Sequence, residues 1–254
     1  MNRPRLPVLM YHGLHEAADA RLDPVYSVTP AEFAAQLDWL RDHGFRTVRL
    51  DKPADVGDRS VVISFDDGDA TNRAVALPLL AERSMVAEFF ITSDFIGQPG
   101  MVSEDEVREL AAAGMGVQAH GRSHRFLEDL NAAELEAELS DSKRRLEAII
   151  GQPVTALALP GGRGGERERA AALRAGYRRV LTSIPGINVG ALARDCRERI
   201  AVTRGMPLEE FSSLLQWHGL QPRLMRMRYH VLAWPKRVLG NRRYERLRAR
   251  ILPG

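Results

Sequence analysis

Short apolar or β-branched runs alternate with helical patterns along the first 205 residues, and this alternation restricts the fold more than any other feature of the chain. The candidate strands are residues 6–11, 45–50, 61–65, 86–92, 116–119, 154–159, 177–182 and 199–203. Strands that alternate with helices are typical of repeated βα units around a parallel sheet. Seven or eight such strands predict an α/β fold, a (β/α) barrel.

Three of the intervening helices have clear signals at both ends. Each begins with a Ser, Thr or Asn three residues before a Glu, which is the spacing of a capping box, and each is followed by a glycine that can end the helix. The capping pairs and their terminal glycines are Thr29/Glu32 with Gly44, Ser103/Glu106 with Gly114, and Asn131/Glu134 with Gly151.

Several predicted strands end in residues that are unusual for a core. In α/β barrels the chemistry gathers where strands end and their following loops begin. The four strand ends in question carry Tyr11-His12, Asp66-Asp67-Gly68, His120 and Pro160-Gly161-Gly162. We therefore expect these residues to converge on one site.

Asp66 and Asp67 are adjacent carboxylates at the end of an apolar run. Alternation along a strand would send one of them into the core, but Gly68 allows the chain to turn sharply, so that both can face one pocket. Close carboxylates repel each other unless a nearby cation favours both charged forms. A bound metal is the simplest such cation.

His120 and His124 supply further ligands, in the segment AHGRSH that follows a predicted strand. Two imidazoles and one carboxylate leave positions open for water and substrate, which is typical of a catalytic metal site. Because Cys196 is the only cysteine, a site with several thiolates is excluded. Histidines at this spacing also occur on helix surfaces and at helix caps, so the metal prediction depends on their combination with FDDG.

The segments VLMYH, SFDDG, HGRSH and ALPGG occur in an order that resembles the polysaccharide deacetylase family, carbohydrate esterase family 4 with its NodB homology domain, in its exopolysaccharide-associated branch. The resemblance runs from about residue 7 to residue 202. It implies a distorted (β/α) barrel of seven or eight strands. It also implies a divalent metal cofactor, zinc, with cobalt or nickel as alternatives.

The resemblance assigns roles to individual residues. By position, Asp67, His120 and His124 resemble the metal ligands of the family, and Asp66 resembles the general base that takes a proton from the attacking water. His12 is the candidate general acid, because poly-N-acetylglucosamine deacetylases of similar motif order place theirs in an equivalent Tyr-His on the first strand. The alternative for His12 is a neutral core histidine.

The third motif departs from the family pattern. Ala158 and Gly161 occupy the positions of an arginine and a tyrosine, so the arginine that orients the base is missing there. Arg163 is a candidate replacement, with an ordinary surface arginine as the alternative. A backbone N–H near Gly161 is expected to help hold the oxyanion, and Pro160, Gly161, Arg163 and Tyr11 are predicted to contact the oxyanion or the substrate.

The chain divides into a predicted catalytic domain, residues 1–219, and a basic tail, residues 220–254. The tail carries ten Lys and Arg against one acid, Glu245, so its charge is +9 within a total of +3, which leaves −6 for the other residues. Pro235 and Gly240 predict that the tail forms two short amphipathic helices. Such helices favour the surface of an anionic membrane, while a solvated basic helix pair or a poorly ordered terminus is the alternative. Nucleic acid is not an expected partner, because the tail matches no such module and the main domain is acidic.

No apolar run reaches the length of a membrane span, and the N-terminal segment lacks the pattern of a signal peptide, so a cytoplasmic location is expected, with contact at the inner face of the membrane. The predicted function is metal-dependent N-deacetylation of N-acetylated sugars in an exopolysaccharide or its lipid-linked precursor. Two alternatives are a catalytically silent carbohydrate-binding barrel and an O-acetyl esterase or deformylase with the same chemistry.

Overall fold

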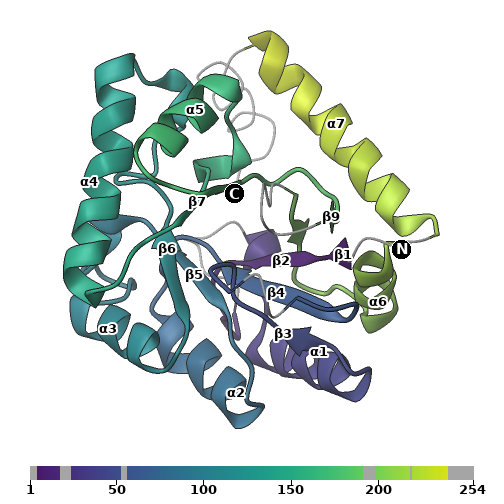
Figure 1. Cartoon of the computed structure of the whole chain (residues 1–254). Coiled ribbons are helices and arrows are strands. Elements are labelled where there is room, and N and C mark those ends of the chain that lie inside the picture. Colours follow the sequence, from purple (N-terminus) through teal and green to yellow (C-terminus); the bar gives the residue numbers. More distant parts are fainter. Residues whose placement is uncertain (1–4, 18–23, 53–55, 191–197, 218, 240–254) are drawn as a thin grey trace.

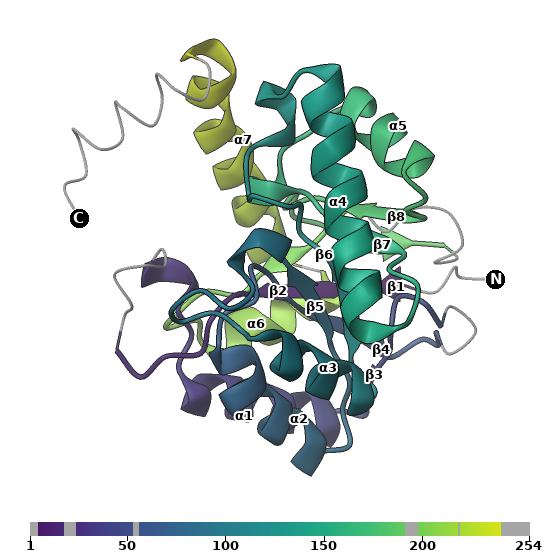
Figure 2. The ribbon, with the colours of Figure 1, turned by 90° about the vertical axis from the view of Figure 1, so that its left-hand side faces the viewer.

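The computed structural model describes residues 5–17, 24–52, 56–190, 198–217 and 219–239. Cys196 and the part of the tail beyond residue 239 lie outside the described residues. Within them, a curled parallel sheet forms the centre of the molecule, and helices cover its outer face (Figure 1, Figure 2).

The sheet confirms the predicted barrel, with one side left open. Its strand order is β10-β2-β4-β5-β6-β7-β8, all neighbours are parallel, and β3 pairs separately with β4. The strands are β2 (Val8–Tyr11), β3 (Arg46–Thr47), β4 (Ser60–Phe65), β5 (Glu88–Ile91), β6 (Gly116–Ala119), β7 (Ala156–Ala158), β8 (Arg179–Leu181) and β10 (Ile200–Ala201). Among the described residues β8 and β10 do not pair, so the barrel is open between them.

A second sheet was not predicted. The expected strand over residues 6–11 is divided at Pro7 into β1 (Arg5–Leu6) and β2, and β1 pairs antiparallel with β9 (Asn188–Val189). Proline has no N–H to donate to a strand ladder, so an interruption at this residue is physically reasonable. Figure 1 shows β1 next to β2.

The described helices are α1 (Pro30–Asp42), α2 (Leu77–Glu82), α3 (Glu104–Ala112), α4 (Ala132–Ile150), α5 (Glu166–Arg174), α6 (Leu208–Gln216) and α7 (Gln221–Leu239). The three with predicted signals, α1, α3 and α4, begin and end close to them. The capping boxes at α1, α3 and α4 are all formed, and Gly151 ends α4 in the left-handed conformation. Within the described ranges, no helix combines the length and the apolar character that crossing a membrane requires.

The tail differs from its prediction of two short helices. α7 continues to Leu239 through Pro235 without a break. A proline inside a helix removes one backbone hydrogen bond and tends to bend the helix, but the chain can keep its helical conformation on both sides. α7 lies along the outside of the molecule (Figure 1), where Arg226 pairs with Glu198 at 2.6 Å and donates a hydrogen bond to the Pro185 carbonyl at 3.0 Å.

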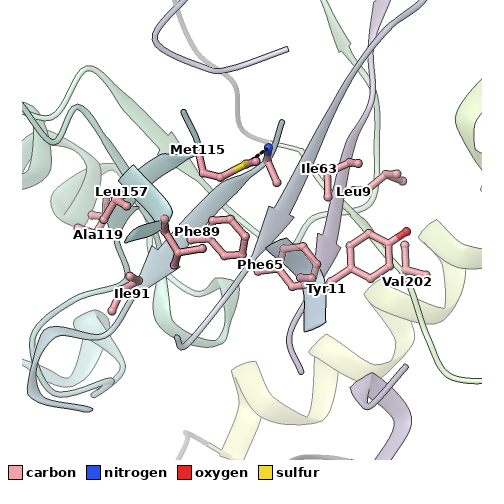
Figure 3. Close-up of a cluster of buried hydrophobic side chains, with 14 of the residues drawn as sticks. Leu9, Tyr11, Ile63, Phe65, Phe89, Ile91, Met115, Ala119, Leu157 and Val202 are labelled. Carbon is pink, nitrogen blue, oxygen red and sulfur yellow. Dashed lines mark hydrogen bonds between the residues drawn. The ribbon is translucent and has the colours of Figure 1, made fainter. Parts of the chain in front are cut away.

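The outward-facing side chains of the sheet form the main core, and Tyr11 is one of them (Figure 3). Its ring lies 5.1 Å from that of Phe33 and 5.3 Å from that of Phe65, and its hydroxyl donates to Gln36 at 2.8 Å. Burial raises the pKa of Tyr11 well above its ordinary value. The prediction that Tyr11 contacts the substrate is therefore wrong: alternation along β2 directs Tyr11 toward the helices and its neighbour His12 toward the opposite side.

Glu88 is a fully buried carboxyl group at the amino end of β5. Its Oε1 accepts a hydrogen bond from the Leu50 N–H at 2.6 Å, and its Oε2 accepts one from the Gln118 side chain at 3.1 Å. A side chain at Gly116 would overlap this carboxyl group, so glycine makes room for it. Burial, opposed in part by the Leu50 hydrogen bond, raises the pKa of Glu88 to about 7.

We expect this group to make the stability of the protein depend on pH. The pKa of Glu88 is higher in the folded state than its ordinary 4.5, so the folded state holds the proton more tightly. The contribution of Glu88 to stability is therefore complete below pH 4.5, the ordinary pKa, and is lost as the pH rises through about 7. Between about pH 5 and about pH 8, the free energy of unfolding of the wild-type protein should fall by about 2.5 kcal/mol relative to that of Glu88→Gln. Urea unfolding of both proteins measures this difference, and parallel pH profiles would contradict it.

Candidate active site

The two aspartates at the end of β4 do face the same site, and the backbone of Asp67 makes this possible. Alternation along β4 directs Val62, Ser64 and Asp66 to the inside of the barrel and would direct Asp67 outward, after Phe65. Asp67 instead adopts a positive φ of 75°, and Gly68 follows with a φ of 92°. A left-handed conformation is uncommon for a residue other than glycine and is typical of functional sites. The turn was predicted at Gly68, but it begins one residue earlier.

Asp67, His120 and His124 come together as one cluster. The Nε2 atoms of His120 and His124 lie 3.3 and 3.2 Å from Asp67 Oδ1. Each of the three residues offers one ligand atom, and all three atoms lie within 4.8 Å of one another. These are the three residues for which the sequence predicted metal binding.

The chemistry of this cluster fits a divalent cation. His120 Nδ1 lies 2.9 Å from the Ala158 carbonyl oxygen, so this nitrogen carries the proton and Nε2 offers its lone pair to the cluster. Asp67 Oδ1 is buried and has no hydrogen-bond partner among the described residues. Burial alone would raise the pKa of Asp67, but positive charge on the adjacent imidazoles brings it well below its ordinary value, so the site favours a carboxylate beside a cation. A charged, unpartnered oxygen that faces two imidazole nitrogens is a set of donors that zinc and related metals bind.

The loop that carries the two histidines is held by helix α4. His120 directly follows β6, and the chain then passes through Gly121 at a φ of 75° and His124 at a φ of 62°. The buried carboxylate of Glu138 accepts hydrogen bonds from the backbone N–H groups of Arg122 and Ser123, at 2.8 and 2.6 Å. Glu138 therefore fixes the turn that brings His124 back toward His120, and the sequence analysis did not identify it.

Arg199 is the second residue that the sequence analysis missed. It is fully buried, and its two terminal nitrogens contact the two oxygens of Asp66 at 2.6 and 2.7 Å. Burial raises the pKa of Asp66, but the charge of Arg199 outweighs this effect and the net pKa is lowered, so the carboxylate stays ionised. Asp66 Oδ2 also lies 3.9 Å from His120 Nε2, on the side of the metal-ligand cluster.

Arg163 does not take the place of the missing arginine. Its guanidinium lies over the ring of Phe126, 4.2 Å from the ring centre, whereas Arg199 holds Asp66. A signal for Arg199 was present in the sequence, because it is the first residue of the predicted apolar strand 199–203. A cation at such a position needs a buried anion as its partner.

His12 lies at the carboxyl end of β2, next to the two aspartates. It is half-buried, and its Nδ1 is buried without a hydrogen-bond partner in the described part of the chain. β2 pairs with β4, and the Asp66 N–H donates to the Tyr11 carbonyl at 2.9 Å, so His12 follows β2 beside the strand end that carries both aspartates. The ring of Tyr26 packs against the His12 ring at a centroid distance of 4.9 Å. Tyr26 belongs to the short 3₁₀ helix Pro24–Tyr26, and no sequence pattern connected it with the site.

The Pro160-Gly161-Gly162 segment forms a tight turn after β7. Gly161 has a φ of 62°, and a Cβ there would lie 2.5 Å from the Phe126 ring. Gly161 itself is exposed. Pro160 packs close to Gly121, so this turn adjoins the loop that carries His120. The oxyanion role of the turn stays a prediction.

Known proteins are similar to this chain in both sequence and fold. The family model described as polysaccharide deacetylase matches residues 54–180, which is half of the chain. YxkH of Bacillus subtilis (strain 168), which its description assigns to the polysaccharide deacetylases, is 29% identical over 223 residues that cover 84% of this chain and 76% of YxkH. The crystal structure of BC0361, a polysaccharide deacetylase from Bacillus cereus, superimposes with a TM-score of 0.76 and 26% identity, and the match covers 84% of this chain and 69% of BC0361.

A shorter match concerns a protein with a named substrate. The poly-beta-1,6-N-acetyl-D-glucosamine N-deacetylase of Staphylococcus aureus (strain MSSA476) is 31% identical over 101 residues, which are 35% of this chain and 35% of that protein. The family match and the similarity in structure confirm the resemblance that the motif order indicated. The chain belongs to the polysaccharide deacetylase family.

Proposed function

We propose that this chain is a metal-dependent hydrolase that removes acetyl groups from N-acetylated sugars of an exopolysaccharide or its lipid-linked precursor. The proposal is carried by one observation: the Asp67, His120 and His124 cluster lies beside a carboxylate, Asp66, that a buried arginine keeps ionised. Membership of the polysaccharide deacetylase family supports the reaction class. The partial match to a poly-N-acetylglucosamine N-deacetylase supports the sugar class.

Asp67, His120 and His124 would hold the metal, for which zinc is proposed and cobalt or nickel are alternatives. A divalent cation in this position would polarise the acetyl carbonyl and acidify the attacking water. Asp66 accepts the proton of that water as its oxygen bonds to the carbonyl carbon. Arg199 keeps Asp66 charged and fixes its orientation, because both carboxylate oxygens are bound.

His12 donates a proton to the sugar nitrogen as the carbon–nitrogen bond breaks, so the products are acetate and a free amine. The imidazole of His12 lies on the opposite side of β2 from the Tyr11 ring, and β2 ends beside the strand that carries the two aspartates, which suits this role. Packing against Tyr26 restrains the imidazole. The backbone N–H of Gly161, an exposed residue, is proposed to donate to the oxyanion during the attack.

Acetate release from N-acetylglucosamine oligomers, measured with the metal content of the same protein, tests the proposal. We expect stoichiometric metal, release of acetate together with new amino groups, and loss of both after chelation, with recovery on adding zinc, cobalt or nickel. His12→Ala should impair amide cleavage more than cleavage of an acetyl ester, because an alkoxide leaves more readily than an amide anion. Acetate release from esters alone would favour an O-acetyl esterase. Sugar binding without any hydrolysis would favour the silent barrel.

A further inference from the structure

The outward side of α7 carries an apolar stripe that no other part of the described chain covers. Eight large hydrophobic side chains are exposed in the described residues, and four of them are Leu220, Leu224, Met227 and Val231. Leu220 directly precedes α7, and the other three lie on it. We call these four residues the outer stripe. Their exposed fractions are 66, 39, 58 and 63%. Their spacing of four, three and four residues places them on one face of a helix.

The outer stripe is not the face with which α7 packs on the barrel. Pro222 is buried, Met225 packs against the main core, and Arg226 bonds to Glu198 and Pro185. At 100° per residue these packed positions lie roughly opposite the outer stripe. α7 therefore has two apolar faces, and packing within the chain accounts for only the inner one. Figure 1 shows the helix on the periphery of the molecule.

Positive charge borders the outer stripe on both sides. By helical position, Arg223 lies on one side and Arg228 on the other, and neither forms an ion pair with a described residue. The sequence after α7, residues 240–254, adds five arginines and one acid. An exposed apolar stripe with basic flanks is the pattern of a helix that lies in the interface of an anionic membrane.

We propose that the outer stripe of α7 attaches the protein to the surface of an anionic lipid bilayer. The four apolar side chains would enter the boundary between headgroups and acyl chains, while Arg223 and Arg228 would contact anionic headgroups. A second copy of the chain fits this face less well, because an interface between two such stripes would bring arginines together without acids to pair with them. The proposal concerns where the enzyme acts and does not depend on its substrate. The cytoplasmic location expected from the sequence stays a separate prediction.

Co-sedimentation of the full-length protein with vesicles of phosphatidylcholine, with and without about 30% phosphatidylglycerol, tests this attachment. We expect binding only to the anionic vesicles and weaker binding as salt increases. The variant Leu224→Gln/Met227→Gln/Val231→Gln should bind roughly a hundredfold less. Arg223→Gln/Arg228→Gln should bind about thirtyfold less, which corresponds to about 2 kcal/mol for two basic groups.

Leu173→Gln is the matched control, because Leu173 is a 44% exposed leucine on α5, away from the outer stripe. It should bind vesicles like the wild type, and thermal unfolding should show that all variants are folded. Equal binding by the triple variant and the wild type would overturn the proposal, since arginines elsewhere would then account for attachment. Absence of wild-type binding would overturn it too. Self-association that the triple variant abolishes, without vesicle binding, would assign the stripe to a second copy instead.

Discussion

Asp66→Asn is expected to lower acetate release by about 10²-fold to 10⁴-fold, because an amide cannot accept the proton of the attacking water. Metal content should stay at the wild-type level, since Asp66 is not one of the three clustered ligand residues. The substitution keeps the size of the side chain. Acetate assays, together with elemental analysis of the same preparation, separate loss of the base from loss of the metal.

Two comparisons make this expectation specific. Asp69→Asn removes another buried carboxylate on the same turn, one that bonds to Thr71 and pairs with His15, and it should reduce activity less than tenfold. His120→Ala should lose metal and activity together. If Asp66→Asn retained activity near that of the wild type, Asp66 would not be the base and the proposed mechanism would be wrong.

Arg199→Met is expected to lower the free energy of unfolding by about 3–5 kcal/mol, because it leaves the buried Asp66 carboxylate without its partner. Arg199 is fully buried and binds Asp66 through two hydrogen bonds of 2.6 and 2.7 Å. Methionine fills most of the volume of the arginine stem, so little of the loss would come from a cavity. Urea unfolding near neutral pH measures the change.

The double variant Asp66→Asn/Arg199→Met is the decisive control for this ion pair. Removing both charges should make the double variant more stable than Arg199→Met alone, because no unpaired charge stays buried. Additive losses would show instead that the two side chains contribute independently. A further comparison with Arg163→Met, which alters an arginine that packs on Phe126, should show a much smaller loss of stability.

Local patterns in the sequence were sufficient to predict most of the secondary structure. The capping boxes at Thr29, Ser103 and Asn131 start helices at the expected residues, since these signals depend only on neighbours along the chain. The strand over residues 116–119 was predicted with its observed bounds. The predicted break at Pro235 does not occur, because a helix can tolerate one internal proline when the flanking residues continue it.

The sequence by itself also determined the family and the group of Asp67, His120 and His124, because these residues lie in short motifs at strand ends, which a parallel barrel brings together. Only the tertiary structure decided which arginine pairs with Asp66. Arg199 follows Asp66 by 133 residues and reaches it across the inside of the barrel, and no local pattern records such a contact. The tertiary structure also decided the side of the sheet on which Tyr11 is buried, because this depends on the packing of β2. It likewise decided the left-handed backbone of Asp67, which the surrounding turn holds in place. Sequence signals act between near neighbours, whereas these three features depend on contacts that exist only after the sheet has curled.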